Sequence, residues 1–386
     1  MAAKTWNVID SSFGSQPVPP NTKLSAPGAS GLAVNYEVAR GGLSDGVEML
    51  TVENGDLKIR IVPTRGMSIW DMTYGEQRLG WKSPVRGPVH PAFVDVGEPS
   101  GLGWLDGFDE LLVRCGLESN GAPEFKEDGT LLYPLHGRIG NKPARRVDVT
   151  IDPDSSEITV VGVVEEVRFH FLKLRLTTTI RTRVGEKGFR IQDRVTNLSQ
   201  SPAEIQMLYH VNFGDPLLDA GSKVIAPIKT IVPRNAHAAE GIGNWSSYEA
   251  PQPGFEEQVY FFELLGNDEG ETQAILKNAH GTEGALLKFN KKQLPCFTVW
   301  KNTTSLADGY VTGIEPGTNF PNPRSYEGEQ GRVVKIGPSG SFDFDFELAY
   351  LSHASEVEAA ESAIAKLQAG VEPQVYAEPQ EGWCAP

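Results

Sequence analysis

The sequence predicts an all-β fold of packed antiparallel sheets, and three observations support this class. Many segments alternate apolar and polar residues with a period of two, which is the pattern of a strand buried on one face. The 41 glycines and 27 prolines are spread between these segments, where they suit tight turns. Only one segment, near the C-terminus, has helical spacing, and strands without intervening helices pack as antiparallel sheets.

The first regular region is a predicted meander. Turn sequences at residues 54–56 and 64–66 separate three short alternating runs, which predicts strands at residues 47–52, 57–62 and 67–72. Before them, residues 14–40 are rich in proline, glycine, serine and asparagine and are typical of an irregular lead-in. After them, residues 83–130 are less regular and are expected to form long loops, which in compact domains usually carry function.

From residue 146 onward the strand pattern dominates. The clearest example is residues 342–348, where phenylalanine alternates with acidic residues as on a half-buried strand. Further strands are predicted at residues 172–181, 189–197, 204–213, 259–264, 285–290, 296–302 and 341–351.

One helix is predicted after the last strand. Ser355 and Glu358 have the spacing of a capping box, and Gly370 suits a left-handed C-terminal cap. An apolar stripe of helical period lies between them, at Val357, Ala360, Ile364 and Leu367. All-β domains often exceed about 200 residues, so we expect one β domain over residues 45–351. An N-terminal arm would precede it over residues 1–44, and a C-terminal helix with a loose tail would follow over residues 352–386.

Composition and absent motifs exclude several classes of function. The formal charge is −15 and no run of lysine or arginine occurs, which argues against nucleic acid or an anionic membrane as partner. The sequence lacks an apolar signal-peptide core and any stretch that could span a bilayer, and its three cysteines are scattered, so we expect a cytoplasmic protein. Because no glycine-rich phosphate loop, Cys-x-x-Cys or His-Glu-x-x-His occurs, we expect neither a nucleotide nor a metal cofactor.

Glu315 is the first candidate catalytic residue. It lies in an alternating run that places Val311, Gly313 and Glu315 on one face of a predicted strand. Pro316 favours an extended backbone at Glu315 and is expected to end the strand there. A carboxylate fixed at a strand end beside a glycine is suited to act as a general base, although it can equally face water.

His210 is the second candidate. In the strand predicted over residues 204–213 it shares a mostly polar face with Gln206 and Asn212, where a carbohydrate could be hydrogen-bonded. A histidine titrates near neutral pH and is therefore a natural proton shuttle. The alternative is a histidine with a purely structural role.

A third histidine, His136, is followed by a glycine that allows a close turn and by Arg138, which carries five hydrogen-bond donors. Recognition of a phosphate would require several such cations to converge. Four residues could supply them: Arg65, Arg114, Arg138 and Lys301. Arg65, between Thr64 and Gly66, can also be a simple turn residue.

The order of three segments resembles the galactose mutarotase (aldose 1-epimerase) superfamily, including its hexose-6-phosphate mutarotase branch. These segments are Leu135-His136-Gly137, Tyr209-His210 and Ile314-Glu315-Pro316. The resemblance covers about residues 45–351. Residues 107–112, 115–117, 121–123 and 136–140 are similar to an uncharacterised bacterial subgroup of aldose 1-epimerase-like proteins.

The resemblance implies a β-supersandwich, in which the concave face of two large antiparallel sheets holds a monosaccharide, and a reaction that needs no cofactor. It implies that Glu315 is the base and His210 the acid of ring opening. His136, Arg114 and Arg65 would hold charge that develops on the sugar oxygens. Arg114 is placed there as the family's arginine upstream of the first histidine, although the sequence around it matches poorly.

Further sugar contacts follow from the same resemblance. Glu257 matches an acidic residue that binds sugar hydroxyls, although the family usually has aspartate there. Trp300 would stack on the sugar, or else be a buried aromatic residue. The neighbouring Lys301 departs from the family's Val-Trp-Asn pattern.

We therefore expect an aldose 1-epimerase acting on a free sugar or a sugar acid, as a monomer or a homodimer. Two alternatives remain open at this point: a carbohydrate-binding protein without turnover, and an isomerase or lyase that uses the same fold. The sequence leaves the identity of the sugar and its phosphorylation undecided.

Overall fold

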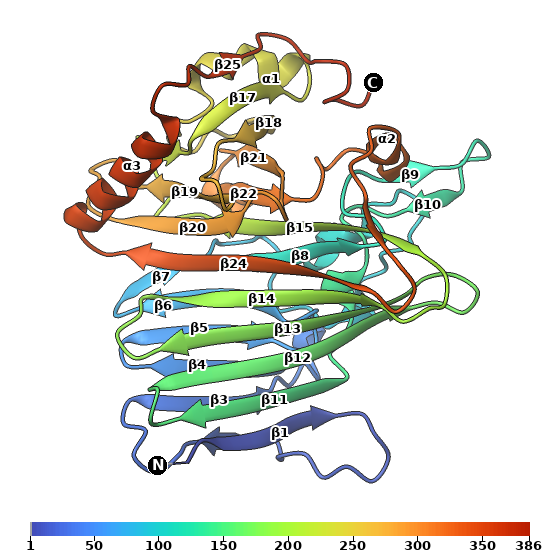
Figure 1. Cartoon of the computed structure of the whole chain (residues 1–386), viewed down its shortest axis with the longest axis vertical. Coiled ribbons are helices and arrows are strands. Elements are labelled where there is room, and N and C mark those ends of the chain that lie inside the picture. Colours follow the sequence, from blue (N-terminus) through green and yellow to red (C-terminus); the bar gives the residue numbers. More distant parts are fainter. Residues whose placement is uncertain (1) are drawn as a thin grey trace.

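Two large sheets form the body of the molecule in the computed structural model, which describes residues 2–386 (Figure 1). The smaller sheet has nine strands. In spatial order these are β1 (Lys4–Asp10), β11 (Arg146–Asp152), β12 (Glu157–Val167), β13 (Lys173–Arg183), β14 (Gly188–Asn197), β24 (Ser341–Leu351), β20 (Gly284–Asn290), β19 (Glu271–Lys277) and β16 (Lys223–Ile225).

The larger sheet has fourteen strands, and twelve of them form its main path. In order these are β2 (Thr22–Leu24), β3 (Leu32–Val38), β4 (Glu48–Asn54), β5 (Leu57–Val62), β6 (Ser68–Tyr74), β8 (Leu112–Leu117), β15 (Ala203–Phe213), β22 (Val311–Gly317), β21 (Cys296–Asn302), β18 (Gln258–Leu264), β17 (Ile228–Pro233) and β25 (Gln374–Val375). In addition, β7 (Gln77–Leu79) pairs with β6, and β23 (Val334–Ile336) pairs with β15. The pairing of β25 with β17 is parallel.

Short elements complete the fold. A separate hairpin consists of β9 (Glu124–Phe125) and β10 (Leu131–Tyr133). The α-helices are α1 (Ala236–Glu240), α2 (Arg324–Glu329) and α3 (Ala354–Gln368). Short 3-10 turns occur at η1 (Gly42–Ser44), η2 (Pro91–Phe93), η3 (Gly103–Gly107), η4 (Ile139–Asn141), η5 (Ile242–Asn244) and η6 (Leu306–Asp308).

Alternation of side chains places the main core between the two sheets. In β12 and β13, which pair over their whole length, every second side chain is buried. From the larger sheet, Met207, Tyr209 and Val211 of β15 join the same core. The expectation of an all-β fold of large antiparallel sheets with a C-terminal helix is thereby confirmed.

Several strands lie in segments that were expected to be irregular. Strands β1, β2 and β3 lie within the segment expected to be an arm, and β1 pairs with β11 at the edge of the smaller sheet. Strand β8 lies in the region expected to be loops. All six of its residues are buried, so its sequence lacks the period of two that marks a half-buried strand.

Helix α3 covers the outer face of the smaller sheet beside β19 and β20 (Figure 1). The expected apolar stripe is buried there at Val357, Ala360 and Ile364. The expected capping box is wrong, because the helix begins two residues earlier, after His353 in place of Ser355, and Glu356 accepts a hydrogen bond from the Ser352 backbone instead. Gly370 has the positive φ of 77° that a left-handed cap requires.

None of the helices within residues 2–386 is long and apolar enough to cross a bilayer.

Arg114 connects the two sheets through a buried ion pair. Its guanidinium contacts the Asp193 carboxylate through Nε and Nη2, and donates to the Met67 carbonyl at 3.1 Å and to Thr178 Oγ1 at 2.7 Å. Tyr209 donates its hydroxyl to the same carboxylate at 2.7 Å. Arg114 and Tyr209 belong to the larger sheet and Asp193 and Thr178 to the smaller one. The expected contact between Arg114 and a sugar is therefore not supported, because its donors face the inter-sheet core.

We predict that Asp193→Asn lowers the free energy of unfolding by about 3–5 kcal/mol, because it leaves a buried guanidinium without its counter-charge. Urea unfolding followed by far-UV circular dichroism measures this difference. Asp343→Asn is the matched control, since Asp343 pairs with Arg194 at the surface, where their side chains are 52% and 60% exposed. It should leave stability essentially unchanged. Equal losses in the two variants would contradict a special role for the buried pair.

Candidate active site

A cleft of about 440 Å³ opens on the larger sheet, on the face opposite to the inter-sheet core. Strands β15, β18, β21 and β22 form its floor, and loops at residues 81–85, 102–108 and 308–309 contribute to its wall. Its polar floor residues are His210, Thr298, Trp300 and Glu315, and Glu257 and His136 border it from loops.

Glu315 and His210 meet in this cleft. They come from neighbouring strands, since β15 pairs with β22, and the distance from His210 Nε2 to Glu315 Oε1 is 3.2 Å. Glu315 is only 2% exposed and does not face bulk water. Strand β22 also continues through Pro316 to Gly317, so the expected end of the strand at Glu315 is wrong.

Gly313 makes room for this pair. A Cβ atom at position 313 would overlap Glu315 Oε1 and would lie 3.0 Å from His210 Cε1. The glycine that the sequence places two residues before Glu315 therefore accommodates the carboxylate itself.

Burial shifts the protonation of both groups toward their neutral forms. Desolvation raises the pKa of Glu315 well above its usual value, the nearby Glu257 raises it further, and Arg234 opposes this. Desolvation lowers the pKa of His210 well below its usual value, and the neighbouring His136 adds to this effect. Glu315 Oε1 also has no hydrogen bond of regular geometry within residues 2–386.

Asn212 does not line the cleft, contrary to the expectation that it binds substrate. It lies beneath His210, with its Oδ1 2.7 Å from His210 Nδ1. Its Nδ2 donates to the Glu110 carbonyl at 3.0 Å and to the His210 carbonyl at 3.3 Å. The whole of this part of β15 is buried, so the face that carries His210 is not exposed to water as alternation suggested.

His136 borders the cleft from a turn with left-handed backbone, where φ is 56° at His136 and 72° at Gly137. A side chain at position 137 would collide with the Ser119 and Gly116 carbonyl oxygens, so the close turn requires glycine. His136 Nδ1 lies 2.9 Å from the Asn120 carbonyl oxygen. Burial lowers the pKa of His136 to about 4.

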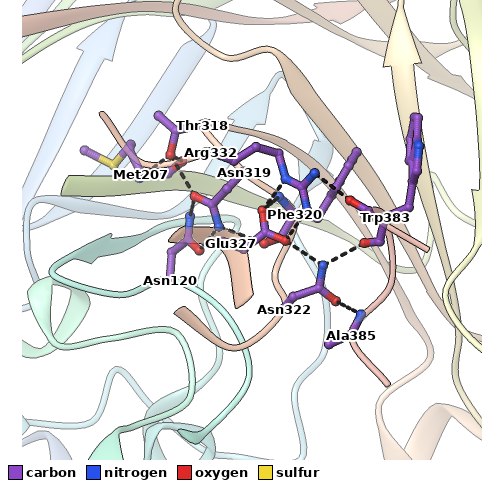
Figure 2. A network of polar contacts seen from close by, with 11 residues as sticks. Asn120, Met207, Thr318, Asn319, Phe320, Asn322, Glu327, Arg332, Trp383 and Ala385 are labelled. Carbon is purple, nitrogen blue, oxygen red and sulfur yellow. Dashed lines mark hydrogen bonds and ion pairs between the residues drawn. The ribbon is translucent and has the colours of Figure 1, made fainter. Parts of the chain in front are cut away.

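A polar network holds the turn of His136 against the end of β22 (Figure 2). Asn120 and Asn319 exchange two amide hydrogen bonds of 2.9 and 2.7 Å. Asn319 lies four residues after Glu315, and Thr318 bonds the Met207 backbone. The network thus connects the segment that presents His136 with the strand that presents Glu315.

The same network anchors the C-terminal tail (Figure 2). Asn322 donates to the Trp383 carbonyl at 2.8 Å and accepts from the Ala385 backbone at 3.2 Å. The buried Glu327 pairs with Arg332. The tail was expected to be loose, but these contacts and the parallel pairing of β25 hold it on the larger sheet.

Glu257 and Trp300 lie together at the rim of the cleft. Trp300 Nε1 donates to Glu257 Oε2 at 2.6 Å, and Arg234 donates to Glu257 Oε1 at 3.1 Å. The Trp300 ring lies 5.6 Å from the ring of His210, which gives the cleft an aromatic wall beside its polar floor.

Three expected cationic contacts are wrong, because these side chains do not line the cleft. Arg65 is fully buried and donates to Glu110, the Asn141 side chain and two carbonyl groups. Lys301 follows Trp300 in β21 and so points to the other face, where it donates to the Asn244 and Ser247 carbonyls. Arg138 also lies outside the cleft lining. These residues and Arg114 therefore do not converge on a phosphate.

Sequence reasoning missed several residues that line the cleft. Aromatic side chains make up much of its wall: Trp81, just before the region expected to form loops, and Trp104 and Phe108 within that region. Thr298 lies directly opposite Glu315 in the β21–β22 pairing, and its hydroxyl has no partner within residues 2–386. Two features of the sequence could have indicated these residues. One is the glycine-rich loop around Trp104, and the other is the alternation that places Thr298 on the same face of its strand as Trp300.

The described part of the chain, residues 2–386, shows no group of three or more histidine, cysteine, aspartate or glutamate side chains arranged to hold a metal ion.

Comparisons with known proteins identify related structures. Over residues 44–350 the chain matches the family model described as a domain of unknown function, DUF4432. A crystal structure of a protein from Klebsiella pneumoniae subsp. pneumoniae, described as a putative aldose 1-epimerase, is 36% identical with a TM-score of 0.94. The match covers 98% of this chain and 99% of that one. A search of curated proteins finds no match.

Two more distant structures share the fold. A galactose mutarotase-like protein from Clostridium acetobutylicum is 15% identical with a TM-score of 0.57, and the match covers 83% of this chain and 98% of that one. A protein from Escherichia coli K12, also described as a putative aldose 1-epimerase, is 13% identical with a TM-score of 0.52. The match covers 79% of this chain and 99% of that one. At these identities the likeness shows the common fold alone.

We predict that Glu315→Gln raises the melting temperature at pH 8 but not at pH 4. Burial holds the folded-state pKa of Glu315 above that of an unfolded glutamate, about 4.3. The stability that the neutral carboxyl contributes is therefore fully present below that value and is lost as the pH rises toward the folded-state pKa. A neutral glutamine avoids this loss.

Differential scanning calorimetry of the two proteins at both pH values measures the effect. Glu256→Gln is the control, because Glu256 is exposed beside Glu257 and should show no pH-dependent difference. The opposite result would be a Glu315→Gln variant that melts at a lower temperature than the unmodified protein at pH 8 but not at pH 4. It would indicate that the ionised carboxylate stabilises the fold.

Proposed function

Because the chain belongs to the DUF4432 family and has the galactose mutarotase-like fold, we propose that it is an aldose 1-epimerase. It would interconvert the two anomers of a sugar by acid–base opening and closure of the ring. The observation that carries this proposal is the pairing of His210 and Glu315 at 3.2 Å on the floor of a cleft of about 440 Å³.

The proposed reaction needs two groups that exchange protons with the sugar. One takes the proton from the anomeric hydroxyl while the other protonates the ring oxygen, so that the bond between the anomeric carbon and the ring oxygen breaks and a carbonyl forms. The aldehyde then rotates, and closure on its other face reverses both proton transfers. Each positioned acid or base contributes about 10²–10⁴ in rate, and the buried His210–Glu315 pair supplies both roles within the reach of one sugar ring.

The remaining cleft residues suit a pyranose with many hydroxyl groups. Thr298 Oγ1 is buried without a partner in residues 2–386, so a sugar hydroxyl would satisfy it. Glu257 is held at the rim by Trp300 and Arg234 and can accept further hydrogen bonds from sugar hydroxyls. The Trp300 ring offers an apolar surface for the carbon–hydrogen face of the ring.

The charges of the cleft favour a neutral sugar over a sugar phosphate or sugar acid. Its charged lining residues besides Glu315, which burial shifts toward its neutral form, are Glu257, Asp308 and Arg234, and this arginine is already paired with Glu257. A phosphate requires several converging donors, and none of the other expected cations reaches the cleft. An anionic substrate would therefore find no unpaired cation among the described cleft residues.

We predict that Glu315→Gln and His210→Asn each lose about 10²–10⁴ in the rate of anomer interconversion while they remain folded. Polarimetry and exchange NMR with a panel of neutral aldoses, uronic acids and sugar phosphates measure this rate. Glu256→Gln and His280→Asn are matched controls, because both residues are exposed and lie outside the cleft, and both variants should keep full activity.

Two outcomes would contradict the proposal. If the unmodified protein accelerates interconversion of no sugar in the panel but is thermally stabilised by one, it is a binding protein without turnover. Binding at one hundred times the dissociation constant would stabilise it by about 2.7 kcal/mol. If Glu315→Gln keeps full activity, the pair is not the catalytic centre. A preference for phosphorylated sugars would overturn the charge argument alone.

A further inference from the structure

The two sides of the cleft differ in chemistry, and the order of the strands beneath it shows how they are arranged. Across the larger sheet the strands follow one another as β8, β15, β22, β21 and β18. His210 and Glu315 lie on the middle pair, β15 and β22. The polar lining residues Thr298 and Glu257 lie on the side of β21 and β18.

The opposite side, over β8, is formed by five apolar side chains that we call the apolar wall. Two segments supply it, and the Leu135 backbone joins them by donating to the Gly101 carbonyl at 2.9 Å. Trp104 and Phe108 belong to the same apolar cluster as Val113 of β8. The members of the wall are Leu102, Trp104, Leu105, Phe108 and Leu135.

The apolar wall begins beside the candidate catalytic pair and continues to the mouth of the cleft. The rings of Phe108 and Trp104 lie 5.2 and 6.0 Å from the ring of His210. Leu102 and Leu105 are each 44% exposed although they line the cleft. A binding site typically pairs a largely apolar lining with a few placed polar groups, so the exposed leucines are suited to cover an apolar part of a ligand.

The polar side chains near the apolar wall are engaged elsewhere. Trp104 Nε1 faces away from the cleft, because a Cβ atom at Gly140 of η4 would lie 3.8 Å from it. Asp106 lies outside the cleft lining, and Ser83 donates its hydroxyl to the Phe108 carbonyl at 2.7 Å. His136 stands at the end of the wall, with its Nδ1 2.9 Å from the Asn120 carbonyl oxygen. A hydroxyl group held against the leucines would therefore lose its hydrogen bonds to water without replacement.

The geometry of a pyranose connects these two sides with the reaction. Opening of the ring places the anomeric carbon and the ring oxygen at the His210–Glu315 pair. The carbons that bear ring hydroxyls leave the anomeric carbon along one edge, and the carbon that bears the exocyclic group is bonded to the ring oxygen on the other edge. When the ring hydroxyls face Thr298 and Glu257, the exocyclic group faces the apolar wall.

We propose that the substrate is a neutral deoxy sugar whose exocyclic group is a methyl, and that Leu102 and Leu105 determine this specificity. The inference rests on the proposed function and names the substrate class of the same site. A methyl group gains from burial against the apolar wall, whereas a hydroxymethyl group in the same place is desolvated without a partner.

Three sugars that differ only in the exocyclic group test the proposal. D-Quinovose carries a methyl, D-glucose a hydroxymethyl and D-xylose a hydrogen. D-Fucose, D-galactose and L-arabinose form the same series with another arrangement of ring hydroxyls. One additional carbon in an apolar pocket is worth about 10–200-fold in kcat/KM, so we expect the methyl sugar of the accepted series to exceed both relatives by about tenfold or more.

Polarimetry and exchange NMR measure kcat/KM for the six sugars. The comparison with the hydrogen-bearing sugar matters because it separates packing of the methyl from exclusion of a hydroxyl. A methyl sugar no better than the hydrogen-bearing one would show that the wall binds no substituent. A hydroxymethyl sugar equal to or better than the methyl sugar would show that the wall is not selective. Either result overturns the proposal.

Substitutions at the mouth of the cleft test whether the apolar wall causes the preference. Leu102→Asn and Leu105→Asn each introduce an amide that can bond a hydroxymethyl group, so the ratio of kcat/KM for methyl over hydroxymethyl sugar should fall toward one. Leu43→Asn is the matched control, because Leu43 is 52% exposed in η1, outside the cleft lining, and should keep the ratio. An unchanged ratio in both folded cleft variants would contradict the assignment to this wall.

Thermal stabilisation by the same six sugars separates this inference from the proposed function. If no sugar is interconverted, the proposed reaction fails, and the order in which the sugars raise the melting temperature still tests the wall. The methyl sugar should then stabilise most, and any other order would overturn the inference. If all six are interconverted with the hydroxymethyl sugars fastest, the proposed function stands and the methyl specificity falls.

Discussion

The buried ion pair between Arg114 and Asp193 is the interaction on which the rest of the architecture depends, because it joins the two sheets at the level of the cleft. Tyr209 of β15 bonds the same carboxylate, and the next residue along that strand, His210, points to the opposite face. One strand therefore carries the inter-sheet anchor on one side and the candidate catalytic imidazole on the other. A change in the packing of the core at this place must also move the floor of the cleft.

The cleft itself is built at a cost to stability. Glu315 and His210 are buried where desolvation opposes their charged forms, and Thr298 Oγ1 and Glu315 Oε1 lack regular partners within residues 2–386. Buried polar groups without partners are unfavourable in a free protein. Under the proposed function, a sugar with several hydroxyl groups would satisfy them, so the features that cost stability without a ligand would favour its binding. The rigid setting of the histidines by Asn212 and Asn120 means that little reorganisation is needed.

The fold provides the scaffold, and the chemistry must be argued from the side chains, because one architecture hosts unrelated reactions. The galactose mutarotase-like fold explains why a large sheet presents several strands side by side across a hollow. The 3.2 Å approach of His210 to Glu315, the glycine at position 313 and the network of Asn120 and Asn319 are the features that favour an acid–base reaction over simple binding. The absence of an unpaired cation among the described cleft residues supports the proposal that the substrate is an uncharged sugar.

The sequence by itself determined the fold class, most of the longer strands, and the residues that converge on the cleft: His136, His210, Glu257, Trp300 and Glu315. The period of two placed His210 and Glu315, because it states which side chains share a face of a strand, whatever that strand pairs with. His136 was singled out by its turn with Gly137, and Glu257 and Trp300 came from the resemblance to the galactose mutarotase superfamily. Only the tertiary structure decided which face of β8 meets the core, which is why Arg114 was misplaced, and only it showed that Arg65 and Asn212 are fully buried. Strands such as β8 and β15 are buried on both faces, and there the pattern cannot distinguish an inter-sheet ion pair from a ligand contact. The position of Asn212 beneath His210 likewise depends on the Glu110 carbonyl, which the pairing of distant segments brings there.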